Sequence, residues 1–143
     1  MKEQEKICIC PAGYHIPTDL EWSRYEYCIE NNIAPTGTTT LATFQDYNLV
    51  LRGSATAGVG PGDKMKVTGW PQNTNTSGFS ALFAGMSSSG ASWNIGANGY
   101  YWSLTENSDI LAWSRSVAIF QTKLIRDNAN NKTNGLSVRC LQN

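Results

Sequence analysis

Four cysteines and a single histidine are the residues of this chain with the greatest scope for chemistry. Cys8 and Cys10 form a Cys-x-Cys pair, but the sequence has no second such pair and only His15 as an imidazole ligand. Because a structural zinc ion needs four ligands held together, these residues make a poor zinc site. We therefore predict disulfide bonds in place of a metal site, and no cofactor.

The even number of cysteines allows several disulfide pairings. A bond between Cys10 and Cys140 would tie the two ends of the domain, and closing a loop of that size stabilises a fold by on the order of 4–5 kcal/mol. A bond between Cys8 and Cys28 would then join a strand to a helix. The competing assignment joins Cys28 to Cys140, and the sequence leaves both open. Disulfide bonds favour an extracellular or cell-surface location.

Catalysis finds little support in the residue pattern. General acid–base catalysis needs a positioned pair of groups with adjusted pKa values, and nucleophilic catalysis needs a nucleophile beside a base. His15 lies next to a turn before an expected helix, which favours a structural role, and the common hydrolase, metalloprotease and phosphate-loop motifs do not occur. Cys8 and Cys10 could form a redox or copper pair, but structural disulfides fit better. We predict that the protein is not an enzyme.

Eleven basic and eleven acidic side chains give this 143-residue chain a formal net charge of zero, with no run of either sign. This balance argues against a nucleic-acid partner or a polybasic membrane patch. No apolar stretch approaches the ~20 residues of a membrane span, and no signal-peptide pattern follows Met1. We expect one domain over residues 1–143, with no direct membrane insertion and no export signal within it.

Two helices are expected in the first third of the chain. Thr18 followed by Glu21 forms a capping box, in which each side chain satisfies a free backbone donor at the helix start. Apolar residues then recur at helical spacing, and Asn31-Asn32 ends the helix. Its charged residues are expected to face solvent: Glu21, Arg24, Glu26 and Glu30. A second helix is predicted from about Thr43 to Leu51.

The rest of the chain is predicted to form a loop followed by short strands. Residues 53–78 are rich in Gly, Ser, Thr, Asn and Pro, and so long a loop is usually functional or packed on itself. Strands are expected at residues 6–10, 79–85, 100–105, 113–120, 123–127 and 136–141. Two N-terminal helices before a set of short antiparallel strands indicate an α+β fold with the helices packed on the sheet.

The predicted strand at residues 113–120 has two chemically different faces. Trp113, Val117 and Ile119 fall on one face, which can be buried. The other face carries small and mixed residues that we expect to be exposed: Ser114, Ser116, Ala118 and Phe120. Periodicity alone fits an ordinary half-buried hairpin. On this assignment, Ser116→Tyr would leave the melting temperature almost unchanged.

The stretch RDNANNKTNG, residues 126–135, separates this strand region from the closing strand. Asparagine is a poor strand and helix former, because its amide competes for nearby backbone groups. The stretch is therefore expected to be irregular, and its composition calls for a functional explanation.

Several blocks of the sequence resemble one known family. CPAGYHIPTDLEW, residues 10–22, is similar to the opening CPxGWHVPTxxEW of the FISUMP family of bacterial extracellular domains, also called the major paralogous domain. GFSALFAG, GYYWSLTE, AWSR and NNKTNGLSVRC resemble later blocks of that family in the same order. The resemblance extends from about Cys10 to Cys140 and is weakest over residues 33–76.

The resemblance implies a C-type lectin-like fold and an overlap with the variable proteins of diversity-generating retroelements. In those systems an error-prone reverse transcriptase randomises the adenines of a template repeat, and adenine-rich asparagine codons are the main targets. The asparagine-rich stretch would then lie close to or inside a variable region at about residues 100–140.

Carried over position by position, the resemblance separates a constant framework from variable positions. The framework would comprise Trp102, Thr105, Glu106, Ala112, Trp113, Arg115, Arg126, Lys132, Gly135, Val138, Arg139 and Cys140. The variable, ligand-binding positions would be Asn107, Ser108, Asp109, Ile110, Leu111, Ser114, Ser116, Ala118, Phe120, Ile125, Asp127 and Ala129. The framework tryptophans and arginines would hold the scaffold, through stacking and through ion pairs with Glu106.

The function implied is the binding of a protein or glycan ligand on another surface, from a bacterial cell or a phage particle, with an unspecified oligomeric state. A fixed cell-surface or lipid-anchored structural or adhesion module of the same family is the alternative. A calcium-dependent sugar lectin is disfavoured, because the Glu-Pro-Asn, Gln-Pro-Asp and Trp-Asn-Asp triplets of such lectins do not occur, and residues 93–95 read Trp-Asn-Ile.

Overall fold

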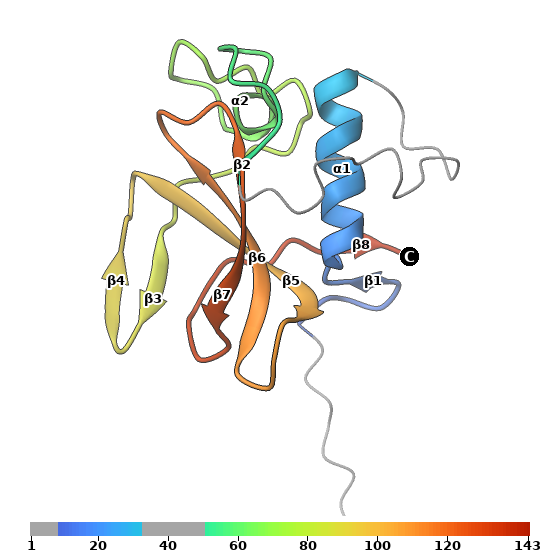
Figure 1. The fold of residues 1–143 in the computed structure, drawn as a ribbon, viewed down its shortest axis with the longest axis vertical. Coiled ribbons are helices and arrows are strands. Elements are labelled where there is room, and N and C mark those ends of the chain that lie inside the picture. The colour runs from blue at the N-terminus through green and yellow to red at the C-terminus, as the bar shows by residue number, and fades with distance from the viewer. Residues whose placement is uncertain (1–8, 33–50) are drawn as a thin grey trace, which may run out of the picture.

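The first helix begins where its capping box predicts. In the computed structural model, which describes residues 9–32 and 51–143, helix α1 spans Asp19–Asn31 (Figure 1). The Thr18 hydroxyl accepts a hydrogen bond from the Glu21 N–H at 3.2 Å, and the Glu21 carboxylate accepts one from the Thr18 N–H at 2.8 Å. Asn32 follows in the left-handed conformation, with a φ of 55°. The predicted helix is therefore confirmed.

A four-stranded antiparallel sheet lies against α1 (Figure 1). Its strand order is β2-β7-β6-β5, so the three long strands follow one another as a meander. The strands are β2 (Leu51–Arg52), β5 (Asn98–Glu106), β6 (Leu111–Ala118) and β7 (Leu124–Asn131). Across the long strands, Tyr101 lies opposite Arg115, and Arg115 lies opposite Arg126. These three side chains share the face that α1 covers.

The hydrophobic core lies between α1 and this sheet. The Trp22 ring packs against the rings of Phe79 and Tyr101, with centroid distances of 5.7 and 6.1 Å. Its indole N–H donates a hydrogen bond to the Trp102 carbonyl oxygen at 3.3 Å, which satisfies the one polar group of the side chain. The buried core consists of Trp22, Met65, Phe79, Ala81, Tyr101, Val117 and Leu124.

Two small antiparallel sheets complete the described strands. One pairs β1 (Tyr14–His15) with β8 (Leu141–Gln142), and the other pairs β3 (Met86–Ser88) with β4 (Ala91–Trp93). Close to the first of them in sequence, a disulfide bond joins Cys10 to Cys140. One of the predicted disulfide pairings is therefore confirmed.

Cys28 is a free, buried thiol, and burial raises the pKa of this thiol. The predicted alternative pairing of Cys28 with Cys140 is therefore wrong. The predicted pairing of Cys28 with Cys8 involves a residue outside the described part of the chain. The position of Cys28 on the buried side of α1 explains the difference, because a small thiol packs there as an apolar side chain.

Residues 53–78 are more ordered than their composition predicts. They contain helix α2 (Pro61–Met65), and two lysines fasten the segment to its neighbours. The Lys64 ammonium donates to two carbonyl oxygens in the last turn of α1, at 2.9 Å each. The Lys66 ammonium donates to three carbonyl oxygens at and after the end of β6, at 2.9–3.4 Å. The segment thereby connects α1 to the central sheet.

The predicted fold class is wrong. Across residues 9–32 and 51–143, eight strands in three antiparallel sheets predominate, and helix is limited to α1 and α2. A C-type lectin-like α+β arrangement, with two N-terminal helices packed on strands, is not what these residues form. The second predicted helix lies outside the described residues except for Leu51, which pairs with Ile125 as part of β2. At Leu51, cross-strand pairing outweighs helical spacing.

Strand prediction was accurate at the centre of the sheet and poor at its margins. The predicted strands at 100–105, 113–120 and 123–127 overlap β5, β6 and the start of β7. Residues 79–85 and 136–140 form only isolated bridges, at Ala81, Gly85 and Ser137, and only Leu141 of the last predicted strand belongs to β8. Residues 9 and 10 form a bend, and the rest of the first predicted strand lies outside the described residues. In the described residues, no helix is long and apolar enough to span a membrane.

Much of the asparagine-rich stretch is regular strand, contrary to prediction. Strand β7 continues through Asn131, with Asn130 opposite Ala112 on β6. The Asn130 amide nitrogen donates to the Ser114 hydroxyl at 2.8 Å and to the Asp127 carboxylate at 2.9 Å. Because side-chain acceptors satisfy this amide, it does not compete with the backbone pairing of the strand.

Candidate functional site

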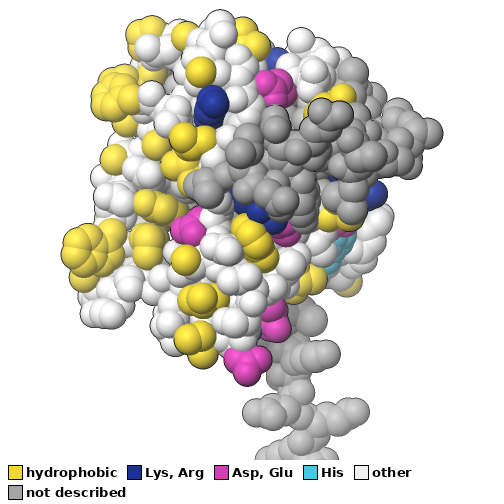
Figure 2. Space-filling view, viewed as in Figure 1, with side chains coloured by type: hydrophobic (Ala, Val, Ile, Leu, Met, Phe, Trp, Pro, Cys, Tyr) yellow, Lys and Arg dark blue, Asp and Glu magenta, His cyan; other side chains and the backbone are white. Residues whose placement is uncertain are grey.

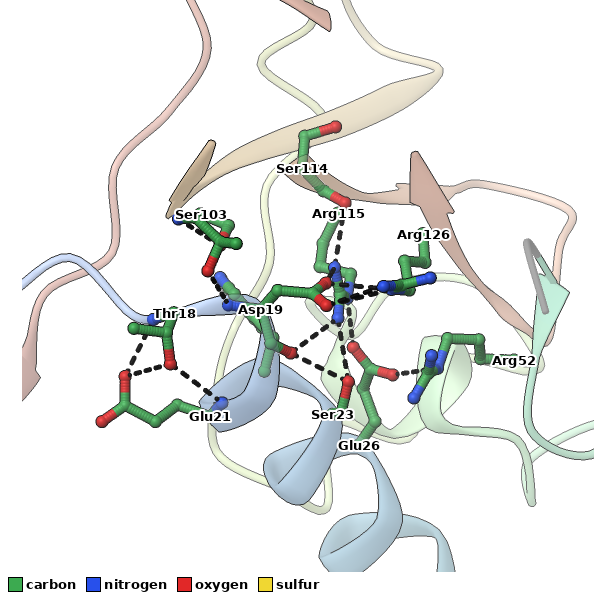
Figure 3. A network of polar contacts seen from close by, with 12 residues as sticks. Thr18, Asp19, Glu21, Ser23, Glu26, Arg52, Ser103, Ser114, Arg115 and Arg126 are labelled. Carbon is green, nitrogen blue, oxygen red and sulfur yellow. Dashed lines mark hydrogen bonds and ion pairs between the residues drawn. The ribbon is translucent and has the colours of Figure 1, made fainter. Parts of the chain in front are cut away.

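Five charged side chains form a buried charge network between α1 and the sheet: Asp19, Glu26, Arg52, Arg115 and Arg126 (Figure 3). Arg115 donates to both acids, to the Asp19 carboxylate at 2.7 Å and to the Glu26 carboxylate through its Nε atom. Arg126 pairs with Asp19 and Arg52 pairs with Glu26, each at 2.7 Å. No side chain of the network is more than 7% exposed.

Burial dominates the electrostatics of this network. It raises the pKa of Glu26, although the positive charges of Arg115 and Arg52 oppose the shift. It also lowers the pKa of Arg52, against the attraction of Glu26. Each charge has exchanged water for partners on another element, so the network fastens α1 to strands β2, β6 and β7. Arg115 and Arg126, two predicted framework residues, lie at this junction.

The acids of the network were missed because charged helix residues were expected to face solvent. Glu26 is instead 3% exposed and Asp19 is 2% exposed. A signal was present, because Asp19, Trp22 and Glu26 follow one another at intervals of three and four residues. That spacing places both acids on the same face of the helix as the core tryptophan.

The other framework residues hold the sheet in different ways. The Arg126 guanidinium lies 3.6 Å from the centre of the Trp113 ring, which confirms stacking between framework side chains. Glu106 pairs with Lys132 at 2.8 Å, in place of the ion pairs with arginine that the sequence suggested. The reason is distance along the strand, because Glu106 lies at the end of β5 and the buried arginines lie near the middle of β6 and β7.

Several of the predicted variable positions meet at one end of the central sheet. The connection between β5 and β6 lies beside the end of β7 (Figure 1), where the Lys132 N–H donates to the Ile110 carbonyl oxygen at 2.9 Å. The Asn107 amide nitrogen donates to the Asn128 carbonyl oxygen at 3.0 Å. We call the exposed residues gathered here the hairpin-end surface: Asn107, Ser108, Asp109, Ile110, Asn128 and Ala129.

Asn128 belongs to this surface but was missing from the predicted set. Two predicted positions beside the surface are only partly exposed. Leu111 pairs with Asn131 in the sheet. The Asp127 carboxylate accepts hydrogen bonds from the Ala129 N–H and the Asn130 amide, both at 2.9 Å. The Asp127 side chain therefore shapes the backbone under the hairpin-end surface.

The central part of the predicted variable face is buried, contrary to expectation. Ser114 is 1% exposed and Ser116 is 5% exposed. Strand β6 lies between β5 and β7, with Trp102 and Asp127 on either side of Ser114. A small side chain on a central strand lies low between larger neighbours on the adjacent strands, so alternation correctly predicts its face but not its exposure.

The remaining predicted positions lie away from the hairpin-end surface. Ala118 and Ile125 are partly buried in the sheet, and Phe120, which is 82% exposed, lies beyond the opposite end of β6. The Phe120 ring meets the ring of Trp70 edge-on, with centroids 5.9 Å apart. Figure 2 shows hydrophobic side chains on one face of the molecule as separate groups with few charges between them. The predicted set is therefore divided between two ends of the sheet and a buried middle.

Comparisons with known proteins give one match. No curated protein and no solved structure matches the chain. The sequence profile of the Fibrobacter succinogenes major domain matches residues 1–142. That match spans nearly the whole chain and agrees with the resemblance carried by the blocks between Cys10 and Cys140. The chain belongs to the Fibrobacter succinogenes major domain family, known as FISUMP.

Proposed function

We propose that this domain is a non-catalytic display module whose hairpin-end surface binds a protein or glycan on another surface, and that a retroelement diversifies this surface. The observation that carries the proposal is the way in which the hairpin-end surface is held. Its residues are exposed, while hydrogen bonds between backbone groups fix the path of the chain beneath them.

Backbone hydrogen bonds matter here because they do not depend on side-chain identity. The N–H groups of Asn107 and Ser108 both donate to the Leu111 carbonyl oxygen, at 2.9 and 3.1 Å. Together with the Lys132–Ile110 bond, they close the turn and fix it to β7. The side chains of Asp109, Ile110, Asn128 and Ala129 form no hydrogen bond with other described residues, so they can be exchanged with little effect on the fold, as a diversified binding surface requires. Exchange of Asn107 or Ser108 removes a side-chain hydrogen bond of the turn, but the backbone bonds remain.

Two further observations fit this function. Ile110 is 64% exposed, and an exposed large apolar side chain among polar neighbours is the kind of residue that contributes binding energy when a partner covers it. The Cys10–Cys140 disulfide fits an extracellular protein, because such bonds persist in oxidising surroundings. The predicted positions Ser114 and Ser116 are not part of the proposed surface, because both are buried.

Deep sequencing of this gene and its flanking DNA in the source population tests the proposal. We expect codons for the hairpin-end surface to vary among individuals, and a nearby repeat to differ from them at adenines only. The codons for Ser114 and Ser116 should be constant, which makes them an internal control. Uniform codons with no template repeat nearby would contradict diversification and would favour a fixed surface module with one dedicated partner.

A further inference from the structure

A pocket of about 280 Å³ lies between α1, the loop before Ala81 and the segment that leads into β8, and no residue of the buried charge network lines it. None of the hairpin-end residues lines it. The lining residues are Pro17, Glu21, Trp22, Tyr25, Ser77, Gly78, Phe79, Arg139, Cys140 and Leu141. Its volume falls just below the range of about 300–1,000 Å³ typical of sites for drug-sized ligands. It therefore suits a ligand group about as large as one amino-acid residue.

Aromatic side chains give this pocket an apolar wall. The ring of Tyr25 packs against that of Phe79 with centroids 5.8 Å apart, and both rings also pack against Trp22. Because these rings belong to the hydrophobic core or pack directly on it, the wall is preformed. A ligand with an apolar or aromatic group can fill the pocket without reorganising the domain.

Arg139 supplies a fixed positive charge at the pocket. Its guanidinium lies 4.7 Å from the centre of the Phe79 ring, and Nη2 donates to the Phe79 carbonyl oxygen at 2.8 Å. A guanidinium carries five N–H donors, and the described residues supply no other acceptor to this one. Stacking on Phe79 holds the guanidinium in place, while the remaining N–H donors of the guanidinium are free to bind a planar anion in a bidentate manner.

The other polar groups of the pocket are already engaged. The Glu21 carboxylate accepts hydrogen bonds from His15 and from the backbone and hydroxyl of Thr18. The Ser77 hydroxyl donates to the Lys64 carbonyl oxygen at 2.8 Å. Arg139 is therefore the main source of unused donors, which suits a single carboxylate better than a phosphate dianion that needs several donors.

We propose that this pocket binds an apolar group that carries a carboxylate, with the carboxylate on Arg139 and the apolar group against Tyr25 and Phe79. The same chemistry exists in two sources, a free N-acylated amino acid and the C-terminal residue of a peptide chain. This site goes beyond the proposed display function, since it shares no residue with the hairpin-end surface.

Titration calorimetry with N-acetyl-L-phenylalanine tests the site on the intact domain. We expect saturable binding, and at least ten-fold weaker binding of N-acetyl-L-phenylalaninamide, which has the same apolar group but no carboxylate. Acetate, which lacks the apolar group, should also bind at least ten-fold more weakly. These comparisons use the unchanged protein, so they do not depend on whether a variant folds.

Variants then locate the binding site. Arg139→Gln should weaken binding of N-acetyl-L-phenylalanine at least ten-fold, because it removes the positively charged guanidinium. Arg24→Gln is the matched control: it removes the same charge from an exposed position of α1 that does not line the pocket, and it should leave the affinity unchanged. Amide shifts at Gly78 and Leu141 in NMR spectra should follow the same saturation curve.

A short peptide that ends in phenylalanine, with a free or an amidated C-terminus, separates the two sources. Tighter binding of the free-acid peptide than of the N-acetylated amino acid would identify the C-terminal residue of a peptide chain as the ligand. Equal affinities would identify the N-acylated amino acid as sufficient, with no contribution from the rest of a peptide. No saturable binding of either acid, equal binding of acid and amide, or full affinity in Arg139→Gln would overturn the proposal. None of these results bears on codon variation at the hairpin-end surface.

Discussion

Arg115 is the most demanding residue of the molecule in energetic terms, because its whole side chain is removed from water. Burying a charge costs several kcal/mol, and attraction to well-placed partners offsets that cost. Asp19 and Glu26 supply the partners from α1, and the Ser23 hydroxyl accepts a further hydrogen bond at 3.2 Å. The position of α1 on the sheet therefore depends on a few charged atoms as well as on apolar packing.

Replacing Arg115 with methionine should lower the free energy of unfolding by about 3–5 kcal/mol, because two buried acids lose a partner. Lys132→Met is the matched control, since Lys132 pairs with a Glu106 carboxylate that is 69% exposed. An exposed pair of this kind contributes about 1 kcal/mol at most. Urea denaturation of both variants measures the difference, and equal losses would contradict the role of the buried charge network.

His15 gives the domain a pH dependence that can be followed at one residue. Its pKa is raised above the ordinary value of 6.5, first by the hydrogen bond with the Asn143 side chain and then by that with Glu21. A group with a raised pKa in the folded state binds its proton more tightly there than in the unfolded state. Its stabilising contribution is therefore complete below pH 6.5 and is lost as the pH rises through the folded-state pKa.

Since His15 is the only histidine of the chain, an NMR titration of its ring reports this pKa without ambiguity. We expect a value above 6.5 in the native domain and a lower value in Asn143→Ala, because the hydrogen bond that contributes most to the raised pKa is removed. Gln142→Ala is the control. It changes the residue next to Asn143, and in the described part of the chain the Gln142 side chain forms no hydrogen bond with His15. An unshifted pKa in the native domain would contradict the two hydrogen bonds.

At the scale of elements, local chemistry predicted those parts of the fold that depend on neighbours in sequence. The capping box of α1 and the alternation of β6 are such features, since a helix start and a strand face are set within a few residues. The burial of Ser116 could not be read in this way. It depends on the larger side chains of Tyr100 and Ile125, which strand pairing brings to either side of it.

Ser116→Tyr should therefore destabilise the domain, by about 1–3 kcal/mol, because a large side chain has to fit where a buried hydroxyl now lies. Asp109→Tyr places the same side chain on the hairpin-end surface and should change the free energy of unfolding by less than about 0.5 kcal/mol. Thermal denaturation of the two variants makes the comparison. Similar melting temperatures would show that β6 is open at Ser116 after all.

The strand formed by the asparagine-rich stretch illustrates the same limit of sequence analysis. Residue propensities correctly describe asparagine as a weak strand former. Strand β7 nevertheless continues to Asn131, because β6 offers a paired edge and Ser114 offers an acceptor for the Asn130 amide. The fold class was mispredicted for a related reason, since short strands that pair only through distant partners leave little trace in local sequence.

At the scale of the whole molecule, the two ends of the described chain are joined twice. Strands β1 and β8 pair Tyr14 with Gln142 and His15 with Leu141, and the Cys10–Cys140 disulfide spans 130 residues of sequence. A two-stranded ribbon of this length is too short to be stable alone. The disulfide supplies most of the constraint on the chain ends, chiefly by reducing the freedom of the unfolded chain.

The double variant Cys10→Ser/Cys140→Ser should lower the free energy of unfolding by about 4–5 kcal/mol, the value that chain entropy gives for a loop of this size. Cys28→Ser is the control, since it removes a cysteine without removing a disulfide bond. Urea denaturation of both proteins under non-reducing conditions measures the effect. A double variant as stable as the native domain would show that the β1–β8 pairing alone fixes the ends.

The two lysines that fasten α2 have a practical consequence for how this domain is handled. The side chains of Lys64 and Lys66 are 7% and 0% exposed, so reagents that acylate primary amines reach them poorly. Lys132, by contrast, is exposed, and it lies directly behind the hairpin-end surface. Amine coupling of a sensor chip or a dye through Lys132 would thus act next to the surface proposed to bind ligand. Attachment through an added terminal tag would leave that surface open to its partner.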